Sequence, residues 1–290
     1  MIKIVQVNEH KDFKIHYDDK QFYALKGKNK EKFYTASSEK VVMESIDADQ
    51  QKKNLKKAKI TLDGLEFKQF VQSSNEFLSE GHLYFEKGVL RIIGMDPANI
   101  ALIKRTVKYK GSLDFWEVGV NLNNLHSFLK RAYKRGMFKL DKITLRFDME
   151  GDTFYMFLGN EFGEIRFPTL ELEEKEAKVP TLKHAVTFSM QLSEFKKYVE
   201  MCDIVAESVT FFVKNNAFGV RAEGDLTRYN KEGIIKVKAD DCESKYSIEY
   251  LRKIFFYTDN IQVNFHKDFP LKLVDDDGNT FILAPRVEND

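Results

Sequence analysis

The residue types that most often perform catalysis occur in this chain without the spacing that such chemistry needs. Its histidines show neither a metal-ligand spacing nor a neighbouring nucleophile motif; they are His10, His16, His82, His126, His184 and His266. The acidic run Asp275-Asp276-Asp277-Gly278-Asn279 lacks the ligand spacing and the terminal glutamate of an EF-hand, so it is better interpreted as a hairpin turn. Glycine-rich phosphate loops are also absent. We therefore expect no enzymatic activity, no metal and no cofactor.

The two cysteines and the overall composition indicate an intracellular globular protein. Neither Cys202 nor Cys242 has a Cys-x-x-Cys partner, which favours reduced thiols over a disulfide or a zinc site. At 290 residues, with 43% hydrophobic and 31% charged residues, the chain has the size of about two domains. No run approaches the roughly 20 apolar residues of a membrane span, and the N-terminal apolar run is too short for a signal peptide.

Basic residues, which could bind nucleic acid, are unevenly distributed along the chain. Residues 1–57 contain 13 lysines and 9 acidic residues, whereas the rest of the chain contains 33 basic and 36 acidic residues. A protein that held nucleic acid by bulk attraction would be more basic than this. Any contact with DNA must therefore come from a local basic surface.

Two amphipathic helices are expected to present such a surface in the first half of the chain. After a strand at residues 58–62, Asp63 and Glu66 fit a capping box for a helix that buries Phe67, Phe70 and Val71 and exposes Lys68. Strands at 82–85 and 89–93 follow, joined by a turn at 86–88. Asn121 can cap a second helix, whose apolar positions are Leu122, Leu125, Phe128, Leu129 and Ala132, and whose outer face carries Lys130, Arg131, Lys134 and Arg135.

The same elements recur in the second half, so the chain is a duplicated unit. Glu66-Phe67-Lys68-Gln69-Phe70-Val71 is nearly repeated as Glu194-Phe195-Lys196-Lys197-Tyr198-Val199. The second helix is echoed by apolar residues at Ile248, Leu251, Ile254 and Phe255. Strand-like runs follow at 142–147 and 260–265, and the offset between copies shrinks from 128 to 118 residues, as loop trimming would produce. Lys196, Lys197, Arg252 and Lys253 lie outside these apolar stripes.

Two segments lie outside the repeat. Residues 13–17 and 21–25 are expected to pair as a hairpin around 18–20 in an appended β-rich arm, and residues 50–57 form a charged linker. Between the copies, residues 168–183 contain a charged stretch bounded by prolines, which indicates an exposed connector.

Four motifs on this repeat give the chain a resemblance to the archaeal and eukaryotic sliding clamps, the proliferating cell nuclear antigen (PCNA) family. They cover residues 91–102, 244–251, 269–273 and 281–288, and their order and spacing match the family from about residue 58 to the end. The resemblance implies an α+β DNA clamp fold with two similar βαβββ-type domains per chain. It divides the chain into an N-terminal extension of unknown role (1–57), clamp domain 1 (58–168), an interdomain connector (169–183) and clamp domain 2 (184–290).

The resemblance further implies a DNA polymerase processivity factor of archaeal type that acts in DNA replication and repair. Three copies would form a ring, a homotrimer, around duplex DNA without sequence preference, with interface strands near 164–167 and 217–223. Further partners would be a clamp loader, DNA polymerase and other proteins with clamp-binding peptides, and no membrane. The protein would be cytoplasmic and nucleoid-associated if archaeal or viral, and nuclear if eukaryotic.

Two sets of site residues follow from the resemblance. Weak phosphate contacts suit a ring that slides, and the DNA-binding set is Lys68, Lys130, Arg131, Lys134, Lys196, Lys197, Arg252 and Lys253. Partner peptides would insert apolar anchors into a groove, whose residues are Met95, Asn99, Leu172, Val179, Pro180, Pro270, Ile282, Ala284, Pro285 and Arg286. Asn99 is polar where some family members have larger side chains.

Two alternatives remain open at this point. One is a checkpoint-type or heteromeric clamp subunit that needs unlike partners to close a ring. The other, less favoured, is a metal-dependent nucleic-acid enzyme that uses the cluster at 275–277.

Overall fold

The computed structural model describes residues 5–10, 13–17, 22–26, 31–36, 59–111, 113, 116–136, 142–150, 153–172 and 177–287. Four N-terminal strands form an antiparallel sheet in the order β1-β2-β3-β4; they are β1 (Val5–His10), β2 (Phe13–Tyr17), β3 (Phe22–Lys26) and β4 (Glu31–Ala36). The pairing of β2 with β3 confirms the predicted hairpin. The turn at 18–20 and the linker at 50–57 lie outside the described residues.

The rest of the chain repeats one order of elements twice. The first half contains β5 (Lys59–Asp63), α2 (Gly64–Asn75), β6 (Glu80–Glu86), β7 (Val89–Met95), β8 (Ala101–Gly111), β9 (Trp116–Asn121), α3 (Leu122–Lys134), β10 (Lys142–Glu150), β11 (Thr153–Asn160) and β12 (Gly163–Pro168). The second contains β13 (Val186–Gln191), α4 (Leu192–Asp203), β14 (Ser208–Lys214), β15 (Ala217–Glu223), β16 (Arg228–Lys236), β17 (Cys242–Ser247), α5 (Ile248–Arg252), β18 (Asn260–Phe265), β19 (Leu271–Asp275) and β20 (Thr280–Leu283). Within the described residues, a βαβββ order therefore occurs twice in each half.

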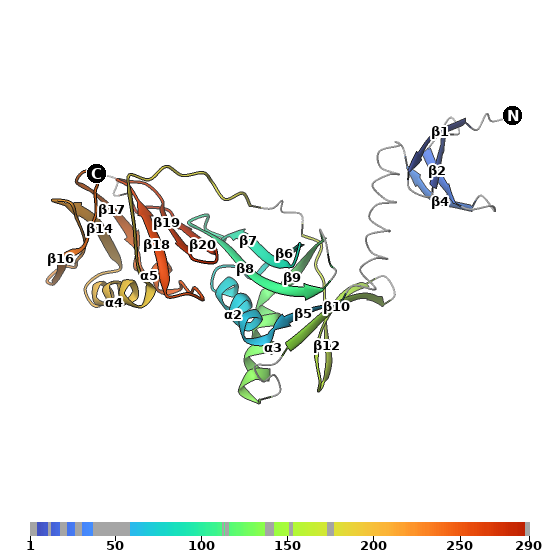
Figure 1. Ribbon diagram of the computed structural model, residues 1–290, viewed down its shortest axis with the longest axis horizontal. Helices are drawn as coiled ribbons and strands as arrows, with labels where there is room; N and C mark the ends of the chain where they lie inside the picture. Colours follow the sequence, from blue (N-terminus) through green and yellow to red (C-terminus); the bar gives the residue numbers. More distant parts are fainter. Residues whose placement is uncertain are drawn as a thin grey trace.

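Helices α2 and α3 form where the sequence predicts them, because local caps and packing agree. Asp63 Oδ1 accepts a hydrogen bond from the Glu66 amide at 3.0 Å, and Asn121 Oδ1 accepts one from the Asn124 amide at 2.9 Å. Phe67, Phe70 and Val71 are completely buried in the core. Helix α2 packs against α3, and α4 packs against α5. Figure 1 shows α2 beside α3 in the first half and α4 beside α5 in the second.

The helix expected around residues 248–255 is shorter than predicted. Helix α5 ends at Arg252, and the next residues leave the helix through a turn in which the Ile254 amide donates to the Leu251 carbonyl. The aromatic residues that follow, 255–257, have low helix propensity, and two of them pack against the first half of the chain. Phe256 is buried beneath Arg105, and the Tyr257 hydroxyl donates to the Glu66 carbonyl at 3.3 Å. Tertiary packing therefore overrides the helical spacing of Ile254 and Phe255.

The two halves are joined by the antiparallel pairing of β8 with β20. This pairing makes a continuous path of strands in the order β12-β11-β10-β5-β8-β20-β19-β18-β13, while β7 also pairs with β8. A second sheet, β16-β15-β14-β17, belongs to the second half. Strand β12 ends the first path and β16 ends the second sheet. No helix among the described residues is both long and apolar enough to cross a membrane.

A buried arginine lies at the junction of the halves. Arg105 on β8 is 0% exposed, and its Nη1 donates to the Thr280 carbonyl of β20 at 3.1 Å. Its guanidinium lies 4.8 Å from the centre of the Phe256 ring. Burial lowers the pKa of Arg105 to about 10, partly opposed by Tyr257 and Asp275. The junction therefore holds a desolvated cation that depends on its neighbours.

We expect Arg105→Ala to lower the free energy of unfolding by about 3 to 5 kcal/mol, because it opens a cavity and removes the buried hydrogen bond to the Thr280 carbonyl. Urea unfolding followed by circular dichroism would measure this. The control is Arg221→Ala, which removes a surface ion pair to Glu243 at 2.8 Å and should cost about 1 kcal/mol or less. Equal effects of the two changes would contradict a special role for Arg105.

Candidate functional site

The eight predicted DNA-contact residues all lie on or directly beside the four helices. Lys68 is on α2; Lys130, Arg131 and Lys134 are on α3; Lys196 and Lys197 are on α4; Arg252 ends α5 and Lys253 follows it. The structure thus gathers the set on the helical side of the molecule. Their side chains differ, however, in whether they already contact other groups of the protein.

Four of the eight side chains contact groups of the protein itself. Arg252 Nη1 lies 2.7 Å from Asp203 Oδ2, and Lys253 Nζ lies 2.7 Å from Glu249 Oε1. Lys68 Nζ lies 5.0 Å from the centre of the Tyr133 ring. Lys196 is half-buried, 6.0 Å from the centre of the Phe255 ring, and burial lowers its pKa. These contacts reduce the charge that the four can offer to a phosphate.

The other four are exposed. Lys130, Arg131, Lys134 and Lys197 reach solvent, and among the described residues no ion pair is recorded for any of them. Arg131 Nε donates to the Ser127 carbonyl one turn earlier, at 3.1 Å. Arg135, which follows α3, is exposed beside them. The most available positive charge is thus on α3 and at Lys197 of α4.

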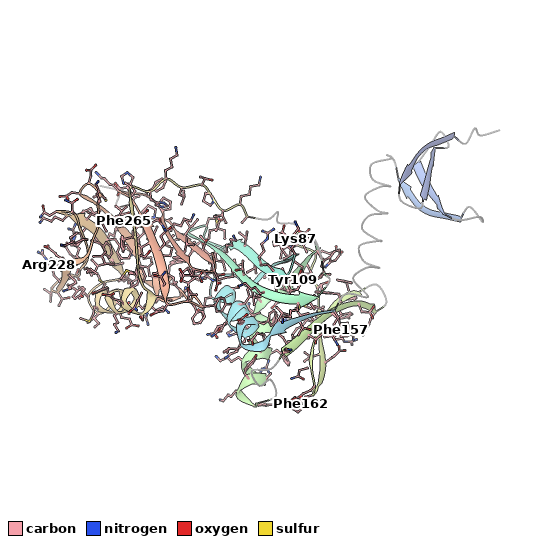
Figure 2. All side chains as sticks on the ribbon, in the orientation of Figure 1. Lys87, Tyr109, Phe157, Phe162, Arg228 and Phe265 are labelled. Atoms are coloured by element: carbon pink, nitrogen blue, oxygen red, sulfur yellow. The ribbon has the colours of Figure 1, made fainter. Side chains whose placement is uncertain are left out.

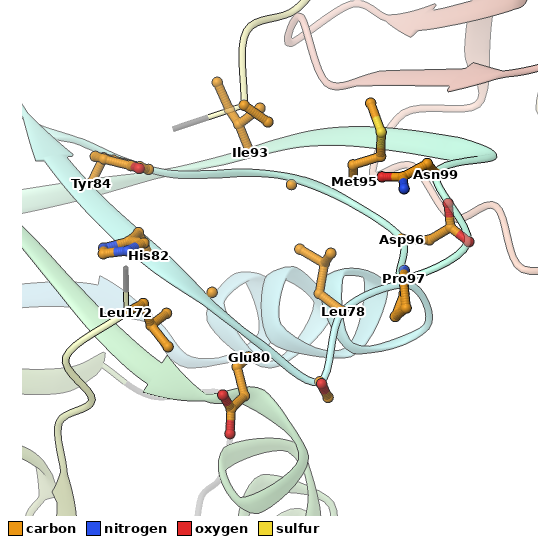
Figure 3. Close-up of a pocket in the computed structure, with 14 residues that line it drawn as sticks. Leu78, Glu80, His82, Tyr84, Ile93, Met95, Asp96, Pro97, Asn99 and Leu172 are labelled. Atoms are coloured by element: carbon orange, nitrogen blue, oxygen red, sulfur yellow. The ribbon is translucent and has the colours of Figure 1, made fainter. Parts of the chain in front are cut away.

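Three of the predicted peptide-contact residues line one hollow of about 630 Å³ beside β6 and β7, shown in Figure 3; they are Met95, Asn99 and Leu172. Met95 is 43% exposed at the end of β7. Asn99 adopts φ = 58°, a left-handed conformation that asparagine tolerates better than larger residues. That backbone requirement explains the polar residue at this position.

The remaining predicted peptide-contact residues are distributed around this hollow or away from it. Ile282 is buried in β20, and the Ala284 amide donates to the Ile100 carbonyl at 2.9 Å, which places the C-terminal tail beside the Met95–Asn99 loop. Pro285 follows in the tail, and Arg286 lines a separate polar hollow with Lys245. The carbonyl of Pro270 accepts from His184 Nε2 at 2.9 Å. Val179 and Pro180 are not among the described residues that line the 630 Å³ hollow.

Sequence reasoning missed several residues of this hollow, including Leu78, Glu80, His82, Tyr84, Ile93 and Asp96. His82 and Tyr84 alternate along β6 with Leu83 and Phe85, which are completely buried. This period of two places His82 and Tyr84 together on the opposite face of the strand. The alternation was the available signal.

Asp96 shapes the loop at the Met95 end of the hollow. Its Oδ1 accepts from the amides of Ala101 (2.6 Å) and Ile100 (2.7 Å), and its Oδ2 accepts from the Tyr250 hydroxyl of α5 at 2.8 Å. Burial alone would raise the pKa of Asp96, but these hydrogen bonds outweigh it and the net shift is downward. Burial and the bond to Asp96 raise the pKa of Tyr250 to about 12. A side chain of the second half thus fixes a loop of the first.

The acidic cluster at 275–277 forms the predicted hairpin turn between β19 and β20. Asp275 Oδ1 accepts from the amides of Asn279 (2.8 Å) and Asp277 (3.0 Å), and Oδ2 accepts from Asn279 Nδ2 at 2.7 Å. Burial raises the pKa of Asp275. Among the described residues, no group of three or more His, Cys, Asp or Glu side chains is arranged to hold a metal ion.

Tyr250→Phe should lower the free energy of unfolding by about 2 kcal/mol, because a buried carboxylate loses a hydroxyl donor. Exchange of the Ile100 and Ala101 amides should become faster. The folded pKa of Asp96 is below the ordinary 3.8, so this effect should be complete above that pH and should vanish as the pH falls through the folded pKa.

The control is Tyr198→Phe, which removes a hydroxyl bonded to Glu194 one turn earlier at 3.0 Å on the surface of α4. It should cost about 1 kcal/mol or less. Unchanged exchange at Ile100 and Ala101 in Tyr250→Phe would show that the hydroxyl does not hold the loop.

Comparison with known proteins gives a consistent result, although no protein-family model matches the chain. The chain is 27% identical over 242 residues to the DNA polymerase sliding clamp of Pyrococcus horikoshii, which covers 77% of this chain and 95% of that clamp. It is 26% identical over 249 residues to DNA polymerase sliding clamp 1 of Thermococcus kodakarensis, with 79% and 98% covered.

Solved structures show the same fold. A. fulgidus PCNA, solved with the C-terminal region of FEN-1, matches 80% of this chain and 100% of its own with a TM-score of 0.68 and 20% identity. PCNA of Thermococcus kodakaraensis matches 79% and 100% with a TM-score of 0.67 and 21% identity. The chain is therefore similar to archaeal DNA polymerase sliding clamps over nearly their whole length, and it shares the fold of archaeal PCNA.

Proposed function

We propose that three copies of this chain join head to tail into a closed ring around duplex DNA and tether DNA polymerase and other replication and repair proteins to it. Residues 58–168 and 184–290 act as its two clamp domains, 169–183 as the connector, and 1–57 as an added extension. The ring works inside the cell, on the replicating DNA. A closed ring around the duplex cannot fall off it. Such a clamp therefore holds the polymerase on DNA without breaking or forming any covalent bond.

The observation that carries this proposal is that sheets of this chain end in unlike strands, among them β12 of the first half and β16 of the second. Figure 2 labels Phe162, in the turn before β12, and Arg228, the first residue of β16, at opposite ends of the clamp halves. Unpaired strand edges can be extended by another chain, and a contact between two different patches generates a ring when the rotation closes. The prediction that Ala217–Glu223 forms the second interface strand was wrong. This segment is β15, which lies inside its sheet between β14 and β16.

Exposed apolar residues accompany both edges. Phe162 is 65% exposed and Ile165 of β12 is 37% exposed. Near β16, Ile204 after α4 is 78% exposed and Leu226 in the β15–β16 turn is 98% exposed. That turn packs against the residue after Ile204, because a Cβ on Gly224 would lie 2.4 Å from the Val205 carbonyl oxygen. Each edge thus offers apolar surface to a complementary partner.

The complex of PCNA2 with PCNA3 from Sulfolobus tokodaii, with a TM-score of 0.64 and 24% identity to this chain, shows that related clamps can assemble from unlike subunits. A heteromeric clamp is therefore the second candidate. Both candidates use the same two edges and differ in whether the partner is a second copy of this chain.

The native protein should elute at about three times the chain mass of 33.9 kDa in size-exclusion chromatography with light scattering. Phe162→Glu and Ile204→Glu should each weaken assembly at least about tenfold, because a charge would be buried at the contact. Val287→Glu, which alters a residue 66% exposed in the C-terminal tail, is the control and should leave the ring intact. A monomeric native protein would contradict self-assembly and favour unlike partners.

The helical face is proposed to line the hole, where weak phosphate contacts give affinity without fixing position. Lys130, Lys134 and Lys197 changed together to Glu should flatten the salt dependence of duplex binding by about one unit of log K per log salt for each lysine that contacts phosphate. Fluorescence anisotropy at several salt concentrations would measure the slope.

The matched control changes Lys87, Lys214 and Lys238 to Glu; these are exposed residues away from the helices, and Figure 2 shows Lys87 on the opposite side of the sheets. This variant alters net charge equally and should keep the native slope. The same slope in both triple variants would argue that DNA does not contact the helical face.

A further inference from the structure

The hollow beside β6 and β7 has two chemically different ends. Figure 3 shows Met95, Asp96, Pro97 and Asn99 at one end and His82, Tyr84 and Leu172 at the other. The Met95 end belongs to the family-derived peptide groove. At the His82 end, only Leu172 was expected from the sequence, whereas His82 and Tyr84 come from a different strand, β6.

The imidazole of His82 is the unusual group at this end. Both ring nitrogens, Nδ1 and Nε2, are buried, and neither has a hydrogen-bond partner among the described residues. The ring stacks on Tyr84 with centroids 5.8 Å apart, which fixes its orientation but satisfies neither nitrogen. Buried polar atoms without partners are rare in folded proteins and are costly unless another group pairs with them. Such an atom beside a hollow indicates that a ligand supplies the missing partner.

The surroundings of His82 restrict what that partner can be. Leu78, Ile93 and Leu172 give the hollow apolar walls, so the entering residue needs an apolar body. Glu80 lines the same hollow, and its Oε1 accepts from Asn121 Nδ2 at 3.1 Å. A carboxylate tip would be repelled by Glu80. A neutral tip with both a donor and an acceptor can pair with either ring nitrogen of His82, whichever of them carries a proton.

We propose that the His82 end of this hollow is a specificity subsite for a partner peptide, and that it takes a residue with an apolar body and a neutral hydrogen-bonding tip, a tyrosine or a glutamine. The inference rests on the proposed peptide tethering and adds to it. The side chain of Leu172 lies beside His82 in Figure 3 and would contact the apolar body of the bound residue. The Met95 end then supplies apolar affinity, while the His82 end discriminates between peptides.

The test uses the full chain and, as probe, the C-terminal region of FEN-1 that is bound to A. fulgidus PCNA in its solved structure. Each probe position is replaced in turn by Tyr, Phe, Gln and Leu, and affinities are measured by fluorescence anisotropy. At one position, Tyr should bind about tenfold better than Phe, and Gln better than Leu. The preference should persist in His82→Gln, which keeps a donor and an acceptor, and disappear in His82→Leu.

His266→Leu is the matched control, because His266 is exposed and does not line this hollow. It should keep the preference. The ring-nitrogen chemical shifts of His82 should also change when the Tyr peptide binds and should change much less with the Phe peptide. This second measurement needs no variant and therefore does not depend on how His82→Leu folds.

The outcomes separate this inference from the proposed function. If the unmodified probe binds and Met95→Glu abolishes binding, but no position shows a preference that depends on His82, the subsite is refuted and the tethering stands. If the unmodified probe does not bind the native protein, the tethering fails and the subsite fails with it.

Discussion

The pairing of β8 with β20 is the interaction on which the rest of the architecture depends. It converts two similar halves into one continuous path of strands, and it thereby fixes where the four helices and the edges β12 and β16 lie. The turn before β20 strengthens it, because Asn279 Oδ1 accepts from the Thr106 amide at 2.7 Å and from the Thr106 hydroxyl at 3.1 Å. The neighbouring residue, Arg105, places its buried guanidinium between the Thr280 carbonyl of β20 and the ring of Phe256.

The loop at the Met95 end of the hollow depends on this junction, because both halves hold it. Two hydrogen bonds cross between the halves at its Met95 end, from the Ala284 amide to the Ile100 carbonyl and from the Tyr250 hydroxyl to Asp96. Helix α5 has only five residues, so Tyr250 and Arg252 are separated by a single residue. The same short helix therefore holds the groove loop with one side chain and contributes basic charge to the helical face with another.

Local patterns made much of this fold predictable, and long-range contacts set the limit. Asp63 and Asn121 cap helices whose first turns are adjacent in sequence, so both caps could be read directly. The cap of α4 could not, because Gln191 makes no side-chain cap bond and the Ser193 amide is instead bonded by Asp259 Oδ1 at 2.8 Å, 66 residues away. The early end of α5 has a similar cause, since Phe256 and Tyr257 are needed at the junction.

The candidate sites show the same division between local and long-range information. Amphipathic spacing placed all eight basic residues on or beside helices, but only the structure shows that Arg252 is held by Asp203 and Lys253 by Glu249. The choice between β15 and β16 as the free edge depends on strand order, which a repeat in the sequence does not specify. His82 was passed over because histidine was examined for metal ligation and catalysis, whereas its significance lies in two nitrogens that the fold leaves without partners.

Under the proposed function, electrostatics explain how a chain with a net charge of only +1 can act on DNA at all. At physiological salt, charges are screened over about 8 Å, so a duplex beside the helical face responds to the nearby lysines and only weakly to acidic residues elsewhere on the molecule. The exposed lysines of α3 and α4 could then exchange one phosphate for the next. Arg252 pairs with Asp203 and Lys253 pairs with Glu249, which lowers the total attraction of the helical face for DNA further. A surface of this kind attracts DNA and still lets it move, which is the balance that a sliding ring requires.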